Sequence, residues 1–152
     1  MLIKKIIALG LILPLVAFAK PKSTDELHIN PLDLSKEQQV VYFSDLYGGD
    51  SQIALSVMEC ESSGSHSAKG DGGRSNGIFQ FQKSSFERME KDFGEDLNYT
   101  SEYDQIKLAS WALANPKYQR EWTAYRAIAN GGKYSFYSSQ MKRHYTIYCN
   151  LI

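Results

Sequence analysis

Two acidic residues near the end of a short apolar helical pattern are the first candidates for chemistry. Glu59 and Glu61 stand two residues apart, about 200° around a helix axis, so only one of them can face a given cleft. Glu61 is favoured, because it lies where the apolar helix meets a polar loop and can be half-buried there. Half burial raises the pKa of a carboxylic acid toward neutrality, which suits a general acid that protonates a glycosidic oxygen. On spacing alone, a surface glutamate remains the commoner interpretation.

The surroundings of Glu61 resemble a known signature. The resemblance lies in residues 60–64 (CESSG) together with 70–81 (GDGGRSNGIFQF). These runs are similar to the paired motif of the lysozyme-like superfamily, which includes soluble lytic transglycosylases, goose-type lysozymes and resuscitation-promoting factors. The likeness is closest over residues 53–86 and weaker to 132. It implies a mainly α, small single-domain lysozyme-like fold with a substrate cleft. It also implies an enzyme that cuts the MurNAc-GlcNAc β-1,4 bond of peptidoglycan without a cofactor.

The resemblance also implies roles for single residues. Glu61 takes the position of the catalytic acid and base, Ser62 that of the serine that supports the helix end, and Gln80 that of a glutamine beside the substrate. Tyr125 is similar to the tyrosine of a later Ala-Tyr-Asn-x-Gly element, although this sequence matches that element only in separate parts. We therefore expect Ser62, Gln80 and Tyr125 to be substrate-binding residues.

Asp71 decides between two mechanisms. The run Gly70-Asp71-Gly72-Gly73 resembles a loop of goose-type lysozymes in which an aspartate activates water, as glycosidases that invert require. The goose pattern has another aspartate two residues after the motif glutamine, and Gln82 stands there instead. An aspartate in a glycine-rich turn also commonly bonds its own backbone. We expect a lytic transglycosylase that uses Glu61; the alternatives are a hydrolytic muramidase with Asp71 as second carboxylate, or a non-catalytic wall-binding or secretion-associated module.

The beginning of the sequence has the pattern of a secretory signal. Lys4 and Lys5 precede an apolar run that closes with Ala17-Phe18-Ala19. The run is shorter than the roughly twenty apolar residues of a membrane-spanning helix, so a retained membrane anchor is the weaker alternative. We expect a cleaved signal peptide over 1–19, a flexible lead-in over 20–34 and a catalytic domain over 35–152. The protein would then be secreted, or periplasmic in the cell envelope, and a monomer.

Charge and cysteine content limit the partners. The 17 basic residues balance 17 acidic ones, so nothing indicates a nucleic-acid partner, and peptidoglycan glycan strands are the expected one. The three histidines have no metal-ligand spacing, and no metal is expected. Cys60 and Cys149, in an exported chain, favour a disulfide over two buried thiols. The resemblance to resuscitation-promoting factors also places Cys60 at a bridged position.

Helix signals are frequent along the chain. A capping box at Ser35 and Gln38 begins the first expected helix, which Gly48-Gly49 ends. Further starts are expected at Asp50, at a capping box of Ser84 with Glu87, at Thr100 or Ser101, and at Asn115-Pro116, the last helix running to Gly131-Gly132. Residues 62–76 are expected to form a loop. Residues 78–81 fit either a strand or a helix start, and 134–148 show no clear period.

Overall fold

The computed structural model describes residues 29–139 and 142–152 of the chain. The expected signal peptide over 1–19 and the first part of the expected lead-in, up to residue 28, lie outside the described residues. Within the described ranges, none of the helices combines the length and the apolar character that crossing a membrane would require.

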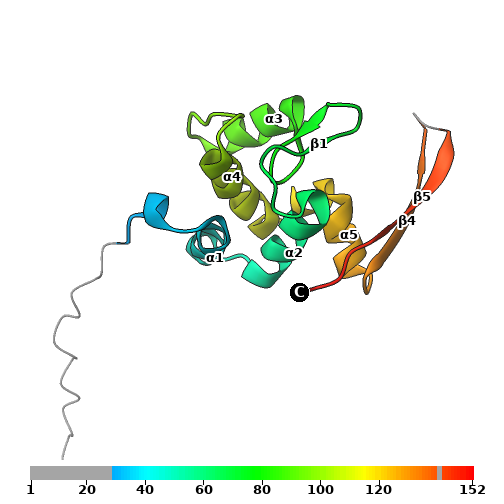
Figure 1. Ribbon diagram of the computed structural model, residues 1–152, viewed down its shortest axis with the longest axis horizontal. Coiled ribbons are helices and arrows are strands. Elements are labelled where there is room, and N and C mark those ends of the chain that lie inside the picture. The colour runs from blue at the N-terminus through cyan, green and yellow to red at the C-terminus, as the bar shows by residue number, and fades with distance from the viewer. Residues whose placement is uncertain (1–28, 140–141) are drawn as a thin grey trace, which may run out of the picture.

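Helices and two small antiparallel sheets make up the described part of the chain (Figure 1). The five α-helices of the described residues are α1 (Lys36–Tyr47), α2 (Ser51–Ser62), α3 (Lys83–Phe93), α4 (Glu102–Ala114) and α5 (Thr123–Ala129), with 3-10 turns η1 (Pro31–Asp33) and η2 (Gln119–Glu121). One sheet joins β1 (Lys69–Gly70), β2 (Ser75–Asn76) and β3 (Phe81–Gln82), and a hairpin joins β4 (Lys133–Ser138) to β5 (Arg143–Tyr148). The expected mainly α domain is therefore a mixed one.

Three helices begin at the capping residues that the sequence indicates. The Ser35 hydroxyl accepts a hydrogen bond from the Gln38 amide, and the Gln38 side chain accepts one from the Ser35 amide, which completes a capping box at α1. The Asp50 carboxylate caps α2, and the Ser101 hydroxyl caps α4. These short-range bonds satisfy amides that have no partner within the helix, so the predicted starts are confirmed.

The predicted start of α3 at Ser84 is wrong. The helix begins at Lys83, and its N-cap, Gln82, makes no side-chain capping bond. Gln82 is also the last residue of β3, so the strand leads directly into the helix and leaves no separate cap. The pairing of β3 with β2 therefore sets the helix start.

The predicted start at Asn115-Pro116 is also wrong. Asn115 bonds the backbone amide of Lys117 through its side chain, and its carbonyl accepts from Tyr118 and Gln119, which forms a turn. The Tyr118 side chain is then fully buried in the core. The chain passes through η2, and α5 begins only at Thr123.

The core lies between the helices, and aromatic rings extend it toward the small sheet. Phe81 meets Phe86 and Trp122 edge-on, at ring-centroid distances of 5.3 Å in both cases. Trp122 is buried, and its indole donates a 2.8 Å hydrogen bond to the Phe79 carbonyl. These contacts tie the small sheet, α3 and the start of α5 into one body.

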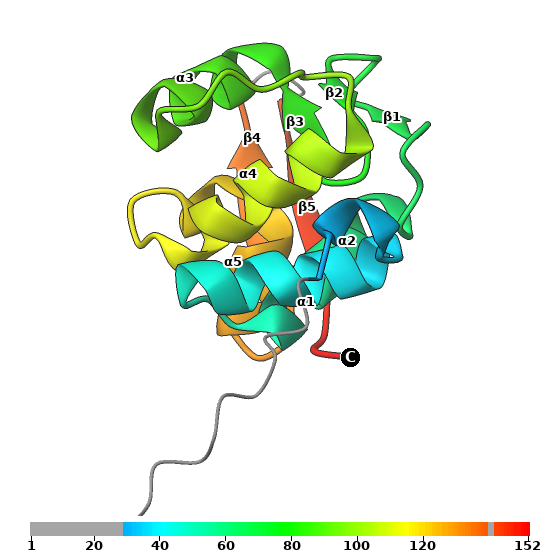
Figure 2. The same cartoon turned by 90° about the vertical axis from the view of Figure 1, so that its left-hand side faces the viewer.

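The hairpin of β4 and β5 stands at the side of the molecule opposite α1, next to α5 (Figure 1). In Figures 1 and 2 its tip points toward the end of the molecule that carries α3 and the small sheet. Its strands pair in antiparallel register, with Phe136 opposite Tyr145. Residues with aromatic and polar side chains occur on both faces, which is why the sequence has no alternating pattern here.

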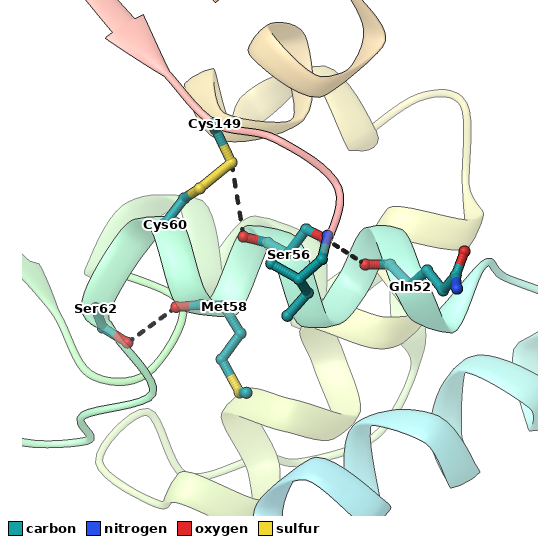
Figure 3. Close-up of a disulfide and its surroundings, with 7 residues drawn as sticks. Gln52, Ser56, Met58, Cys60, Ser62 and Cys149 are labelled. Carbon is teal, nitrogen blue, oxygen red and sulfur yellow. Dashed lines mark hydrogen bonds between the residues drawn. A yellow bond between two sulfur atoms is a disulfide. The ribbon is translucent and has the colours of Figure 1, made fainter. Parts of the chain in front are cut away.

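A disulfide joins α2 to the segment that follows β5 (Figure 3). Cys60 and Cys149 lie with their Cα atoms 6.0 Å apart, which confirms the predicted bridge. Beyond it, the Ile152 amide donates a 3.0 Å hydrogen bond to the Ser56 hydroxyl, so the chain returns along α2. The base of the hairpin is thereby fixed beside the residue that precedes Glu61.

Candidate active site

A cleft of about 790 Å³ opens beside the end of α2. Four parts of the chain form its walls: the end of α2, the small sheet with its first loop and the start of α3, the segment from η2 into α5, and the inner face of the hairpin. The lining residues are Glu61, Gly70, Asp71, Gly72, Arg74, Ser75, Gln80, Phe81, Gln82, Ser85, Met89, Glu121, Trp122, Thr123, Phe136, Ser138, Tyr145 and Ile147.

Glu61 reaches this cleft because of its place on α2. It follows the buried Val57 by four residues and Met58 by three, so it lies on the face that packs into the core. The helix ends one residue later, at Ser62, and Ser63 adopts a left-handed conformation. The core therefore stops beside Glu61 and the cleft begins, whereas Glu59 on another face is exposed.

The surroundings of Glu61 favour its protonated form. Burial is the largest influence and raises the pKa of Glu61 to about 7, from an ordinary value of 4.5. A hydrogen bond from the Ala124 backbone amide, at the start of α5, acts in the opposite direction, and the charge of Asp71 adds to the rise. A carboxyl group of this pKa can both give and take a proton near neutral pH.

Ser62 supports the end of α2 and does not line the cleft. Its hydroxyl donates a 2.7 Å hydrogen bond to the Ile78 carbonyl, and it also lies 3.3 Å from the Met58 carbonyl. This geometry provides the helix-supporting part of the role expected for Ser62. It does not provide the substrate-binding part, because the hydroxyl is engaged within the fold.

Gln80 lines the cleft with its amide group fixed. Its backbone has a left-handed φ of 51°, and its side-chain nitrogen donates to the Ala68 carbonyl at 3.1 Å and to the Gly77 carbonyl at 2.8 Å. The amide oxygen lies close to Gly70, where a Cβ would come within 2.4 Å of it. Gln80 therefore holds the turn of residues 77–80 against β1 and presents part of its surface to the cleft.

Asp71 stands in the loop between β1 and β2, exposed, with a left-handed φ of 51°. Its carboxylate accepts a 2.6 Å hydrogen bond from the Ser75 hydroxyl and a 3.5 Å one from the Gln82 amide. Both of these bonds come from other side chains, in contrast to a turn former that bonds its own backbone. Both carboxyl groups, of Glu61 and Asp71, line the same cleft.

Tyr125 lies outside the lining of the cleft that contains Glu61. Its hydroxyl donates to the Gln119 side chain, and it lines a separate pocket of about 370 Å³ with Arg120, Arg126, Ala129, Asn130 and Tyr134. Tyr125 follows Thr123, which does line the cleft, by two residues, about 200° around the axis of α5. The partial match to the later family element therefore gave the wrong residue for the cleft.

The hairpin supplies cleft residues that the sequence analysis did not predict. Phe136 and Tyr145 face each other across the two strands and line the cleft with Ser138 and Ile147. An indication was present: every second residue from Tyr134 to Ser138 falls on one face if this segment is read as a strand. The sequence alone does not show that the two strands pair as a hairpin, so it could not place that face opposite Glu61.

No protein-family model and no curated protein matches the chain. Within residues 29–139 and 142–152, His, Cys, Asp and Glu side chains do not gather in groups of three that could hold a metal ion. The acidic groups that this cleft offers for chemistry include the carboxyl groups of Glu61 and Asp71.

Proposed function

We propose that this protein is an exported enzyme that cleaves the glycan strands of peptidoglycan, with Glu61 as its general acid and base. The observation that carries the proposal is a partly buried carboxyl group with a pKa of about 7 in the wall of an open cleft of about 790 Å³. Such a group is suited to protonating the oxygen of a glycosidic bond. The resemblance of residues 60–64 and 70–81 to the lysozyme-like superfamily gives the substrate class.

The favoured reaction is lytic transglycosylation. Glu61 gives its proton to the oxygen between the two sugars, the bond from that oxygen to the anomeric carbon of N-acetylmuramic acid breaks, and the second sugar leaves as an alcohol. The Glu61 carboxylate then takes the proton of the C6 hydroxyl of the same muramic acid. The C6 oxygen bonds to the anomeric carbon, which closes a 1,6-anhydro ring, and Glu61 returns to its protonated form.

A hydrolytic muramidase is the second candidate, and the place of Asp71 favours it. Its carboxylate lines the same cleft and is oriented by Ser75 and Gln82. A second carboxylate in that position could accept a proton from water as the water attacks the anomeric carbon. The product would then have a reducing end of inverted configuration.

We also propose a lysozyme-like fold and export for this chain. A helix with the acid in its last turn, followed by a small antiparallel sheet across a cleft, supports the fold. The disulfide between Cys60 and Cys149 supports an oxidising compartment such as the periplasm or the cell exterior.

Digestion of purified sacculi followed by mass spectrometry of the soluble products tests the function. We expect fragments that end in 1,6-anhydro-N-acetylmuramic acid, and none from a Glu61→Gln control. Fragments with reducing ends would select the muramidase. Absence of any released fragment would refute both and favour the non-catalytic wall-binding module.

A further inference from the structure

The inner face of the hairpin carries a row of aromatic rings. Tyr134 and Phe136 stack with their centroids 5.8 Å apart, and Phe136 and Tyr145 stack at 5.9 Å with planes 21° from parallel. The row runs along β4 and crosses to β5. Phe136 and Tyr145 belong to the cleft that contains Glu61, and both are partly exposed to it.

The core does not need these rings. Neither Phe136 nor Tyr145 is among the buried core residues or among the partly buried residues packed against the core. The Arg143 guanidinium lies 4.5 Å from the centroid of the Tyr145 ring, and its Nε donates a hydrogen bond to the Tyr145 hydroxyl, which orients the ring. An oriented, partly exposed aromatic pair in the wall of a cleft is typical of a binding surface.

The rest of the lining indicates what kind of ligand fits. Polar side chains such as Gln82, Ser85 and Thr123 share the cleft with the aromatic pair. A sugar ring has a matching character, with hydroxyl groups around its edge and C–H groups on its faces. Strands of six residues extend about 20 Å, more than a single sugar ring, so the wall can accompany a chain of several units.

We infer that the Phe136–Tyr145 pair is a sugar-stacking platform, which binds a glycan strand beside the residue that cleaves it. This inference rests on the proposed function, since it takes the glycan of that reaction as its ligand. The platform holds sugars one or more units from the scissile bond, while Glu61 acts at the bond itself. The disulfide at the base of the hairpin fixes the distance between the two.

Binding to glycans tests the platform apart from catalysis. All variants are made in a Glu61→Gln background, so that the glycan is bound and not consumed, and are titrated with a tetramer of N-acetylglucosamine by calorimetry and with intact sacculi by sedimentation. Phe136→Leu and Tyr145→Leu keep an apolar side chain and remove the flat ring. Each should weaken binding about 5- to 10-fold, in the range that a single aromatic stacking contact contributes.

Tyr137 provides the matched control, because it lies on the same strand but on the outer face and is 55% exposed. Tyr137→Leu should bind as the parent does, and all three variants should unfold at the temperature of the parent. Unchanged binding of both inner-face variants would overturn the platform, as would an equal loss in Tyr137→Leu or a parent that binds neither glycan.

The outcome for the proposed function is separate, because release of fragments by the wild-type protein measures it. Glycan binding that depends on Phe136 and Tyr145, without any release, would retain the platform and refute the enzyme. Release of fragments by the wild type, with inner-face variants that bind like the parent, would retain the enzyme and refute the platform.

Discussion

At the scale of single residues, opposing influences act on the carboxyl group of Glu61. Withdrawal from water disfavours its carboxylate, and the nearby Asp71 charge does so as well, whereas the Ala124 amide stabilises it. The balance leaves a group that changes its protonation near pH 7. The position is therefore costly to the folded protein at neutral pH and useful to a catalyst.

Replacing Glu61 by Gln should abolish catalysis and retain the fold. The amide keeps the shape of the side chain but has no proton to give to the leaving oxygen, so release of fragments from sacculi should fall by a factor on the order of 100 or more. Glu59→Gln is the matched control, because that residue is exposed, and it should keep wild-type activity. Equal losses in the two variants would show that Glu61 is not the acid.

The rate of cleavage should depend on pH through the same group. The acid must carry its proton when substrate binds, so activity should be level below the pKa of about 7 and fall about tenfold per pH unit above it. Initial rates across the neutral range check this. A rate that already declines near the ordinary value of 4.5 would contradict the raised pKa.

Stability should depend on pH in the same direction. In the unfolded chain Glu61 loses its proton near 4.5, and in the folded protein near 7, so the folded state holds the extra proton between these values. The stabilisation is fully present below 4.5 and is lost as pH rises to 7. Urea unfolding should therefore find Glu61→Gln more stable than wild type by about 3 kcal/mol at about pH 8, with no such gain near pH 4. A difference in unfolding free energy between the two proteins that is the same at both pH values would argue against burial as the cause of the raised pKa.

The substitution Asp71→Asn, which replaces one carboxylate oxygen by an amide nitrogen, distinguishes the two proposed reactions. If Glu61 acts alone, the amide of Asn should keep the bond with Ser75 and much of the activity, and the products should still be anhydro sugars. If Asp71 activates water, the amide cannot accept the proton, and activity should fall on the order of 100-fold or more. We expect the first result, measured by fragment release with circular dichroism as a control for folding.

At the scale of elements, the turn between β2 and β3 brings Gln80 to the cleft. It depends on Gly77, which has a φ of 81° and is buried against Gln105. A Cβ at this position would come within 2.1 Å of the Gln105 amide oxygen. Gln105 itself is buried and donates to the Tyr99 carbonyl, so it cannot move aside without losing that bond.

Gly77→Ala should therefore destabilise the protein by about 3 kcal/mol or more, from backbone strain and overpacking together. Gly73→Ala is the control: its φ of 90° is also left-handed, but nothing lies within 4 Å of the added carbon, so only strain of about 1 to 2 kcal/mol should remain. Denaturant unfolding measures both. Similar losses in the two variants would mean that the contact with Gln105 contributes nothing.

The disulfide is the element that fixes the hairpin. It closes a loop across a sequence separation of 89 residues, and such a loop contributes about 4 to 5 kcal/mol on the chain-entropy model. Cys149→Ser, made together with Cys60→Ser to avoid a free thiol, should lower the free energy of unfolding by an amount of this order. A change below about 1 kcal/mol would show that the bridge is not what stabilises the fold.

At the scale of the whole molecule, the sequence predicted the helix starts that depend on local hydrogen bonds. It did not predict the helix starts that depend on tertiary contacts. The starts of α1, α2 and α4 depend on capping side chains within three residues, and they were predicted correctly. The start of α3 depends on a strand that pairs elsewhere, and the start of α5 follows a turn whose Tyr118 is buried in the core. Neither the pairing of that strand nor the burial of Tyr118 can be predicted from the neighbouring residues in the sequence.

The same distinction applies to the cleft. Glu61, Asp71 and Gln80 lie within twenty residues of one another and were singled out together, and the structure places all three in the cleft lining. Phe136 and Tyr145 come from a hairpin far along the chain and were not predicted. Tyr125 was expected from a partial motif, and the direction of its side chain on α5 takes it to another pocket.

The bridge between α2 and the segment after β5 also sets an order of events in time. Synthesis runs from the amino end, so Glu61 leaves the ribosome long before Phe136, Tyr145 and Cys149. Until the hairpin emerges, the wall opposite the acid does not exist, and until Cys149 emerges, Cys60 has no partner. The cleft is therefore finished last, and a chain interrupted between Glu61 and the hairpin has the reactive group without the surface that faces it.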